Sequence, residues 1–139
     1  MTGKTNVQDY ATEQLNLLLT RLASRVHHAA KSPGPDEIHD VRVSIRRFSQ
    51  GLIIFAGLLP KAEVKKVRKR LKQMMRLTSE IRNRDIALEF LLRSGRAALK
   101  SRLQKERAEY QHQFAGIVRR WNARDFSARW RNRLLLGKV

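Results

Sequence analysis

The stretch Glu37–Asp85, EIHDVRVSIRRFSQGLIIFAGLLPKAEVKKVRKRLKQMMRLTSEIRNRD, determines the fold that we expect for this chain. Apolar residues recur in it every three or four positions on both sides of Pro60, which is the spacing of one buried helix face. The first stripe is Ile38, Val41, Ile45, Phe48, Leu52, Phe55 and Leu59. The second is Val64, Val67, Leu71, Met74 or Met75, Thr78 and Ile81. We therefore predict two antiparallel helices that pack through these stripes.

The ends of these two helices follow from proline, acidic residues and turn residues. The first begins at Pro35 or Asp36, where acidic side chains favour a helix N-terminus. Its second half, GLIIFAGLL, is apolar nearly all round and is expected to be the most buried part. Gly51 and Gly57 indicate close approach of a neighbouring helix, because glycine otherwise weakens a helix. The second helix runs from Lys61 to about Arg82, with a break near Asn83 and a short helix over 84–93.

The remaining residues complete an all-α fold. Residues 5–31 carry one apolar stripe at helical spacing, and Ser32-Pro33-Gly34-Pro35 ends that helix. After a turn at Ser94-Gly95, a long helix is expected over 96–123 and a short amphipathic one over 125–136. No stretch shows the alternation of a strand, so we predict a single domain over 1–139, an antiparallel four-helix bundle with long helices, short loops and a short extra C-terminal helix.

The charge of the chain points to an anionic partner. The 30 Lys and Arg residues face 12 Asp and Glu, which gives a formal net charge of +18. Between His39 and Arg84 there are thirteen basic and three acidic residues, so a net +10 lies in this segment. Such an excess repels itself unless a partner neutralises it, whether nucleic acid, an anionic membrane or an inorganic chain. The absence of Cys excludes disulfides and Cys-based metal sites. The lack of a long apolar run favours a cytoplasmic protein without a membrane span.

Two rows of basic residues are the candidate binding site. His39, Arg42 and Arg46 stand three and four positions apart on one helix, with Arg47 beside them, and guanidinium groups suit phosphate oxygens. The next helix carries a second row, of which 65, 68, 72 and 76 share a face. That row comprises Lys65, Arg68, Lys69, Lys72 and Arg76, followed by Arg82 and Arg84. A solvated basic face is the alternative interpretation.

Other chemistry has little support in the sequence. Asp85 is interpreted as orienting a neighbouring arginine or as a charge at a helix N-terminus. Acidic residues are scattered singly, so paired carboxylates for hydrolysis are hard to assemble. His27, His28 and His112 lack ligands at metal-binding spacing, and no metal or other cofactor is expected. Aromatic residues are few and fall at core positions, so no base-stacking platform is evident, although binding to a nucleic-acid backbone stays open.

The motifs IHDVRVSIRRF, residues 38–48, and EIRNRDIAL, residues 80–88, resemble the two signatures of the CHAD family, the conserved-histidine alpha-helical domain. The resemblance covers about residues 5–123, leaving 124–139 as a C-terminal extension. It implies a helical domain that binds inorganic polyphosphate along a basic surface, often at polyphosphate granules. In the first signature it matches His39, Arg42, Arg46 and Arg47. In the second it matches Arg82, Arg84 and Asp85, while Lys72 and Arg76 fall within the family's basic helix.

The chain departs from this family in length. The family's domain is usually built of two similar helical halves, and no second His/Arg signature follows residue 96. The chain is then a short version, a fragment, or one partner of a homodimer that restores the two halves. We expect non-catalytic binding of polyphosphate. The alternatives are a general nucleic-acid-binding protein and an accessory subunit of a phosphate-metabolising enzyme.

Overall fold

The computed structural model describes residues 3–137, and these residues form helices and connecting turns without a strand. The elements are α1 (Gly3–Lys31), α2 (Pro35–Ile54), a short 3-10 helix η1 (Ala56–Leu58), α3 (Lys61–Phe90), α4 (Ala97–Ala123) and α5 (Phe126–Arg133). The predicted all-α bundle of four long helices with a short fifth one is therefore confirmed. None of the helices in the described part of the chain is long and apolar enough to cross a membrane.

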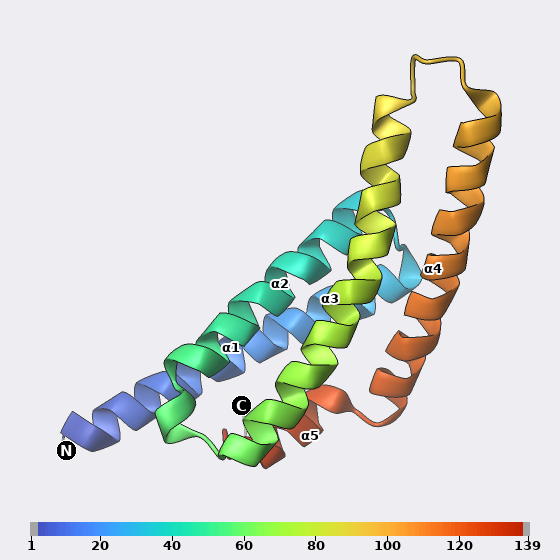
Figure 1. Ribbon diagram of the computed structural model, residues 1–139. Coiled ribbons are helices and arrows are strands. Elements are labelled where there is room, and N and C mark those ends of the chain that lie inside the picture. The colour runs from blue at the N-terminus through green and yellow to red at the C-terminus, as the bar shows by residue number, and fades with distance from the viewer. Residues whose placement is uncertain (1–2, 138–139) are drawn as a thin grey trace.

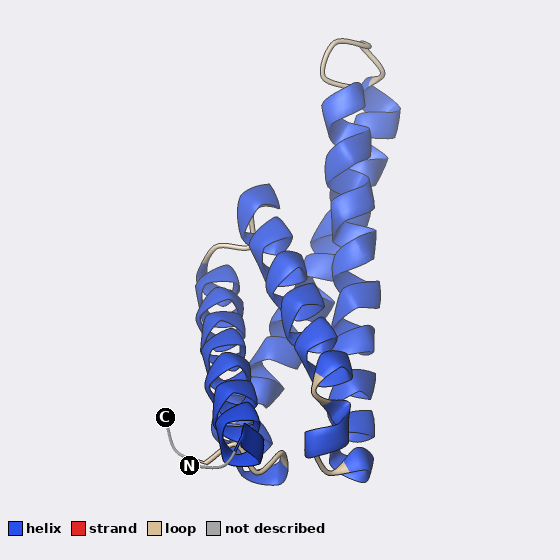
Figure 2. Cartoon of the chain, turned by 90° about the vertical axis from the view of Figure 1, so that its left-hand side faces the viewer, coloured by secondary structure: helices blue, strands red, loops and turns tan. Residues whose placement is uncertain are grey.

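The four long helices form two antiparallel hairpins that pack across each other. The first hairpin is α1 with α2, and the second is α3 with α4 (Figure 1). The axes of the two hairpins are inclined, and α2 packs against α3. The α3–α4 hairpin extends well beyond the ends of α1 and α2, as the side view in Figure 2 makes plain. Its far end is therefore covered by neither α1 nor α2.

The core lies where the two hairpins meet. The predicted stripes of α2 and α3 supply much of it, with Phe48 and Met74 both fully buried. Helix α1 adds Leu15, Leu19 and Leu22, of which the spacing had predicted Leu15 and Leu22. The short α5 closes one end, where Trp130 lies against Trp121 and Phe126 with ring centroids 5.2 and 5.0 Å away. Burial of these apolar faces provides the main driving force for the fold.

Gly51 allows α1 and α2 to approach closely. A Cβ atom built on Gly51 would lie 3.0 Å from Cδ2 of Leu15 and 3.1 Å from Cδ1 of Leu18. These contacts are tight, which explains why a residue that weakens a helix stands here. The same expectation was wrong for Gly57, since nothing lies within 4 Å of its Cβ position.

Two further expectations about the decisive stretch were wrong. The apolar segment after Gly51 is not the most buried part, because α2 ends at Ile54 at the edge of the bundle, where Ile53 and Ile54 are 54% and 72% exposed. Helix α3 has no break at Asn83 and continues to Phe90. It continues because α4 packs alongside, and contacts from Arg84 and Asp85 to α4 support this part of α3.

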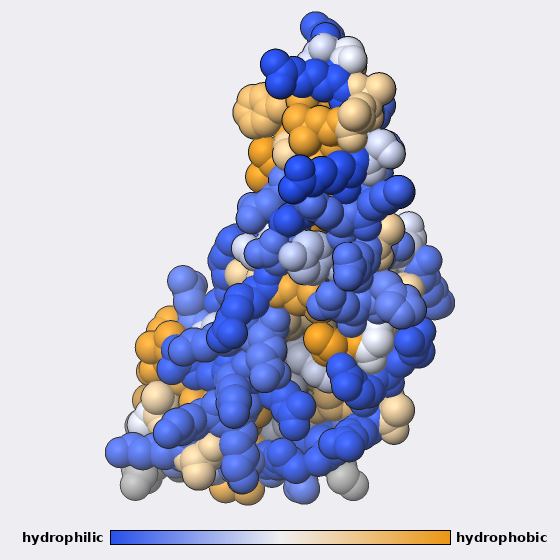
Figure 3. Space-filling view, turned by 45° about the vertical axis from the view of Figure 1, so that its right-hand side comes forward, coloured by the Kyte–Doolittle hydropathy of each residue, from blue (hydrophilic) through white to orange (hydrophobic). Residues whose placement is uncertain are grey.

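The projecting end of the α3–α4 hairpin carries exposed apolar side chains. Phe90 and Leu92 are 82% and 69% exposed, and Ile86 and Leu99 are partly exposed. In Figure 3 a hydrophobic patch lies near the tip of the hairpin, while most of the remaining visible face is hydrophilic. The tip thus differs in character from the basic body of the molecule.

Candidate functional site

Arg42 of α2 lies at the contact between the two hairpins, where α3 holds its guanidinium group. Its Nη1 donates to the carbonyl oxygen of Met75 at 2.8 Å and to Oγ1 of Thr78 at 3.1 Å, both on α3. Thr78 is fully buried and in turn donates to the carbonyl oxygen of Met74 at 2.8 Å. Because these bonds use one guanidinium nitrogen, the rest of the group is available for a ligand. The bonds hold Arg42 in place at the α2–α3 contact.

Arg46 and Arg82 lie near Arg42 and concentrate positive charge there. Burial lowers the pKa of Arg42 below its ordinary value, and the charges of Arg46 and Arg82 lower that pKa further. In the described part of the chain, none of these three arginines forms an ion pair with a carboxylate. The structure thus brings together three predicted residues from two helices, and their charges oppose one another.

The other predicted cations of α3 lie on one continuous face and differ in their exposure. Arg68, Lys72 and Arg82 precede or follow Met75 at helical steps, so they share the side of α3 that meets α2. Arg68 is half-buried and Lys72 is exposed. Lys65, Lys69 and Arg76 are exposed as well, and Lys65 stands two helical turns before Lys72, so these side chains extend the basic face outward.

His39 and Arg47 line a hollow on the α1 side of α2. This hollow also holds Arg21 and Arg25 of α1. Its one acid, Asp40, lies 4.0 Å from the guanidinium of Arg25. His39 and Arg47 are both exposed, and the basic surface of α2 therefore runs from the α3 side over to α1.

Arg84 faces α4 and is already paired. Its guanidinium bonds to the carboxylates of Glu80 and Glu106, the latter at 3.3 Å, and lies 4.8 Å from the centroid of the Tyr110 ring. Burial acts to lower the pKa of Arg84, but the hydrogen bonds to Glu80 and Glu106 outweigh it and raise the pKa above its ordinary value. This pairing balances the charge of Arg84 within the protein.

Asp85 forms an ion pair with Arg107 of α4, and not with the neighbouring Arg84. Nε of Arg107 donates to Oδ1 of Asp85 at 2.5 Å. The same guanidinium donates to the carbonyl oxygen of Pro33 at 2.9 Å and to Oε1 of Gln111 at 2.7 Å. Both side chains of the pair are largely buried, with exposures of 7% and 16%. Asp85 lies inside α3, so its interpretation as a charge at a helix N-terminus was wrong.

Sequence reasoning missed three groups of basic residues. Arg21 and Arg25 join the α2 surface, and their four-residue spacing was a usable signal. Arg107 links α4 to α3 and to the loop between α1 and α2. Nothing in its local sequence distinguishes it from the other basic residues of the helices. Five arginines of α3, α4, α5 and the α4–α5 turn also surround a separate pocket that no motif indicated.

The donors at the α2–α3 contact suit anions rather than metal ions. Guanidinium and ammonium groups only donate hydrogen bonds, and they match the oxygens of phosphate. The described residues contain no group of three or more His, Asp or Glu side chains arranged to hold a metal ion. The arrangement can therefore hold a polyanion by charge-assisted hydrogen bonds.

Fold and charge together define a strongly basic, all-helical domain. The family model of the CHAD domain matches residues 10–138, nearly the whole chain. The chain therefore belongs to the CHAD family, as its two motifs indicated. Comparisons with curated proteins and with solved structures gave no significant match.

Proposed function

We propose that this chain binds inorganic polyphosphate, without catalysis, on the surface where α2 meets α3. We call this the α2–α3 surface and define it by six residues. They are Arg42 and Arg46 of α2, Arg68, Lys72 and Arg82 of α3, and His39 at the border with the hollow on the α1 side of α2. Membership of the CHAD family supports the ligand, because polyphosphate binding is the general property of these domains. The net charge of +18 supports a polyanionic partner of any kind.

The observation that carries the proposal is the cluster of Arg42, Arg46 and Arg82, which have no carboxylate partner within residues 3–137. Arg42 is fixed by Thr78 and Met75, so little of its side-chain entropy remains to be lost on binding. Its pKa is depressed by burial and by its two neighbours, which is a sign of mutual repulsion. An anionic chain that contacts all three groups would relieve this repulsion and form charge-assisted bonds with successive phosphates.

The remaining predicted residues receive different parts in this proposal. Arg47, Lys65, Lys69 and Arg76 are exposed and flank the α2–α3 surface, so they would attract the chain at longer range. Arg84 is balanced by Glu80 and Glu106, and we assign it to the α3–α4 contact rather than to the ligand. Asp85 orients Arg107, which is likewise structural.

The runner-up function is backbone binding of nucleic acid, and a competition experiment separates the two. Protein loaded with long-chain polyphosphate is challenged with single- and double-stranded nucleic acid at physiological salt and matched phosphate concentration. We expect polyphosphate to stay bound, because the close arginines suit its closely spaced charges and the chain offers few exposed aromatic rings for bases. Equal displacement by nucleic acid would favour the general binder.

The proposal extends to self-association of the chain and to its place in the cell. Two copies can restore a two-half arrangement through the exposed apolar tip around Phe90 and Leu92. A monomer mass in light scattering with polyphosphate bound would exclude that pairing.

An accessory role beside a phosphate-metabolising enzyme, and a cytoplasmic place at polyphosphate granules, are consistent with binding. A fluorescent fusion that avoids such granules would contradict that location.

A further inference from the structure

A second cluster of arginines surrounds a pocket that shares no residue with the α2–α3 surface. The pocket lies between α3, α4 and α5 and has a volume of about 390 Å³. The pocket is lined by Arg70 of α3, Arg120 of α4, Arg124 in the turn between α4 and α5, and Arg129 and Arg133 of α5. In the described part of the chain, none of the five forms an ion pair with a carboxylate. None of them belongs to the α2–α3 surface.

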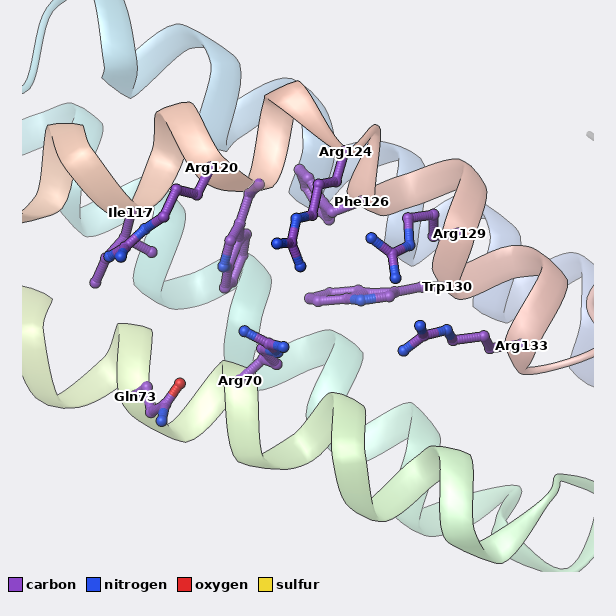
Figure 4. A pocket seen from close by; sticks show the side chains of 10 residues that line it. Arg70, Gln73, Ile117, Arg120, Arg124, Phe126, Arg129, Trp130 and Arg133 are labelled. Carbon is purple, nitrogen blue, oxygen red and sulfur yellow. The ribbon is translucent and has the colours of Figure 1, made fainter.

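The floor of this pocket is aromatic. Trp121, Phe126 and Trp130 line it, and their ring centroids lie 5.0 to 5.2 Å from one another. Figure 4 shows the guanidinium groups of Arg70, Arg124 and Arg129 around the plane of the Trp130 ring. Trp121 is 8% exposed and Trp130 is 6% exposed, so most of each ring is buried and the remaining edge forms part of the pocket floor. A hollow with cations on its rim and aromatic carbon at its base suits a ligand with both characters.

We propose that this pocket binds a small phosphorylated molecule with a flat apolar part, of the class of nucleoside di- and triphosphates. Several guanidinium groups without a carboxylate partner in the described part of the chain favour a ligand with more than one negative charge, and adjacent phosphates supply it. The aromatic floor favours a planar ring, which apolar and cation–π contacts can hold. The volume falls in the usual range for small-molecule sites, and a polyphosphate chain alone would leave the aromatic wall unused.

Intrinsic fluorescence provides a local readout, because the chain has only two tryptophans and both line this pocket. The probes are ATP, tripolyphosphate and adenosine, with excitation at the red edge of the indole band, where adenine does not absorb. We expect ATP to change the fluorescence in a saturable way. Tripolyphosphate should bind at least about tenfold more weakly, and adenosine should not saturate. Equal affinity for ATP and tripolyphosphate would overturn the proposed ligand class.

Matched variants connect the signal to the pocket. Arg124→Ala with Arg129→Ala removes two exposed cations of the rim, and we expect ATP binding to weaken at least about tenfold. Arg93→Ala with Arg96→Ala removes the same charge at the distant hairpin tip and should leave binding unchanged. Arg46→Ala on the α2–α3 surface should also leave it unchanged, which separates this site from polyphosphate binding. Equal losses in all three variants, with native circular dichroism, would refute a pocket and indicate general charge attraction.

Discussion

Replacing Asp85 with alanine is expected to lower the free energy of unfolding by about 2–4 kcal/mol. The substitution leaves Arg107 with a largely buried charge and no carboxylate partner among its contacts. Arg107 also holds the carbonyl oxygen of Pro33, so its displacement loosens the α1–α2 loop from α4. Urea unfolding followed by circular dichroism measures the change.

Glu89→Ala is the matched control for this prediction. Glu89 stands one turn further along α3, is exposed and forms no ion pair among the described residues. Its loss should change the stability by less than about 0.5 kcal/mol. The double variant Asp85→Ala with Arg107→Ala should be less destabilised than the sum of the two single variants, because it leaves no charge unpaired. Additive losses would show that the two residues act independently.

Charge reversal on the α2–α3 surface is expected to weaken polyphosphate binding by at least about a hundredfold. The double variant Arg46→Glu with Lys72→Glu changes one exposed side chain on each helix, so the fold should tolerate it. Each substitution removes a charge-assisted contact and adds repulsion toward phosphate. Arg42 is left intact, since its bonds to Met75 and Thr78 join the two helices. Fluorescence anisotropy with labelled polyphosphate at physiological salt gives the affinity.

The control reverses the same number of charges elsewhere. Arg93 and Arg96 are exposed near the turn between α3 and α4, away from the α2–α3 surface. Arg93→Glu with Arg96→Glu should weaken binding by less than about tenfold, since only long-range attraction is lost. If both double variants lose affinity equally, binding is spread over the whole basic surface and the proposed site is wrong.

The fold was predictable because its signals are local. Apolar spacing defined the long helices, and proline and glycine defined the turns. We predicted a break near Asn83 because the polar run Arg82-Asn83-Arg84-Asp85 lacks a clear apolar stripe in the sequence. That prediction was wrong, since α3 continues through this run. In the structure this run is helical, and Glu106 and Arg107 of α4, about twenty residues away in sequence, bond to Arg84 and Asp85 and stabilise it. Contacts of this kind follow from packing and leave no local pattern.

The candidate site was predictable as a set of charges but not as a geometry. The sequence indicated two basic rows, yet it could not show that Arg84 is paired while Arg82 remains beside Arg42. Nor could helical spacing alone reveal that Arg47 shares a hollow with Arg21 and Arg25 of α1. The aromatic pocket is formed by three helices, so no single segment of the sequence indicates it.

Mapping the bound polyphosphate by NMR tests the central claim most directly. Backbone amide shifts of the labelled chain are followed during titration with polyphosphate at physiological salt. The proposed function predicts that the largest changes cluster at residues 39–47 of α2 and 68–82 of α3. Changes that are uniform over all basic segments, or largest at residues 117–133, would contradict binding at the α2–α3 surface.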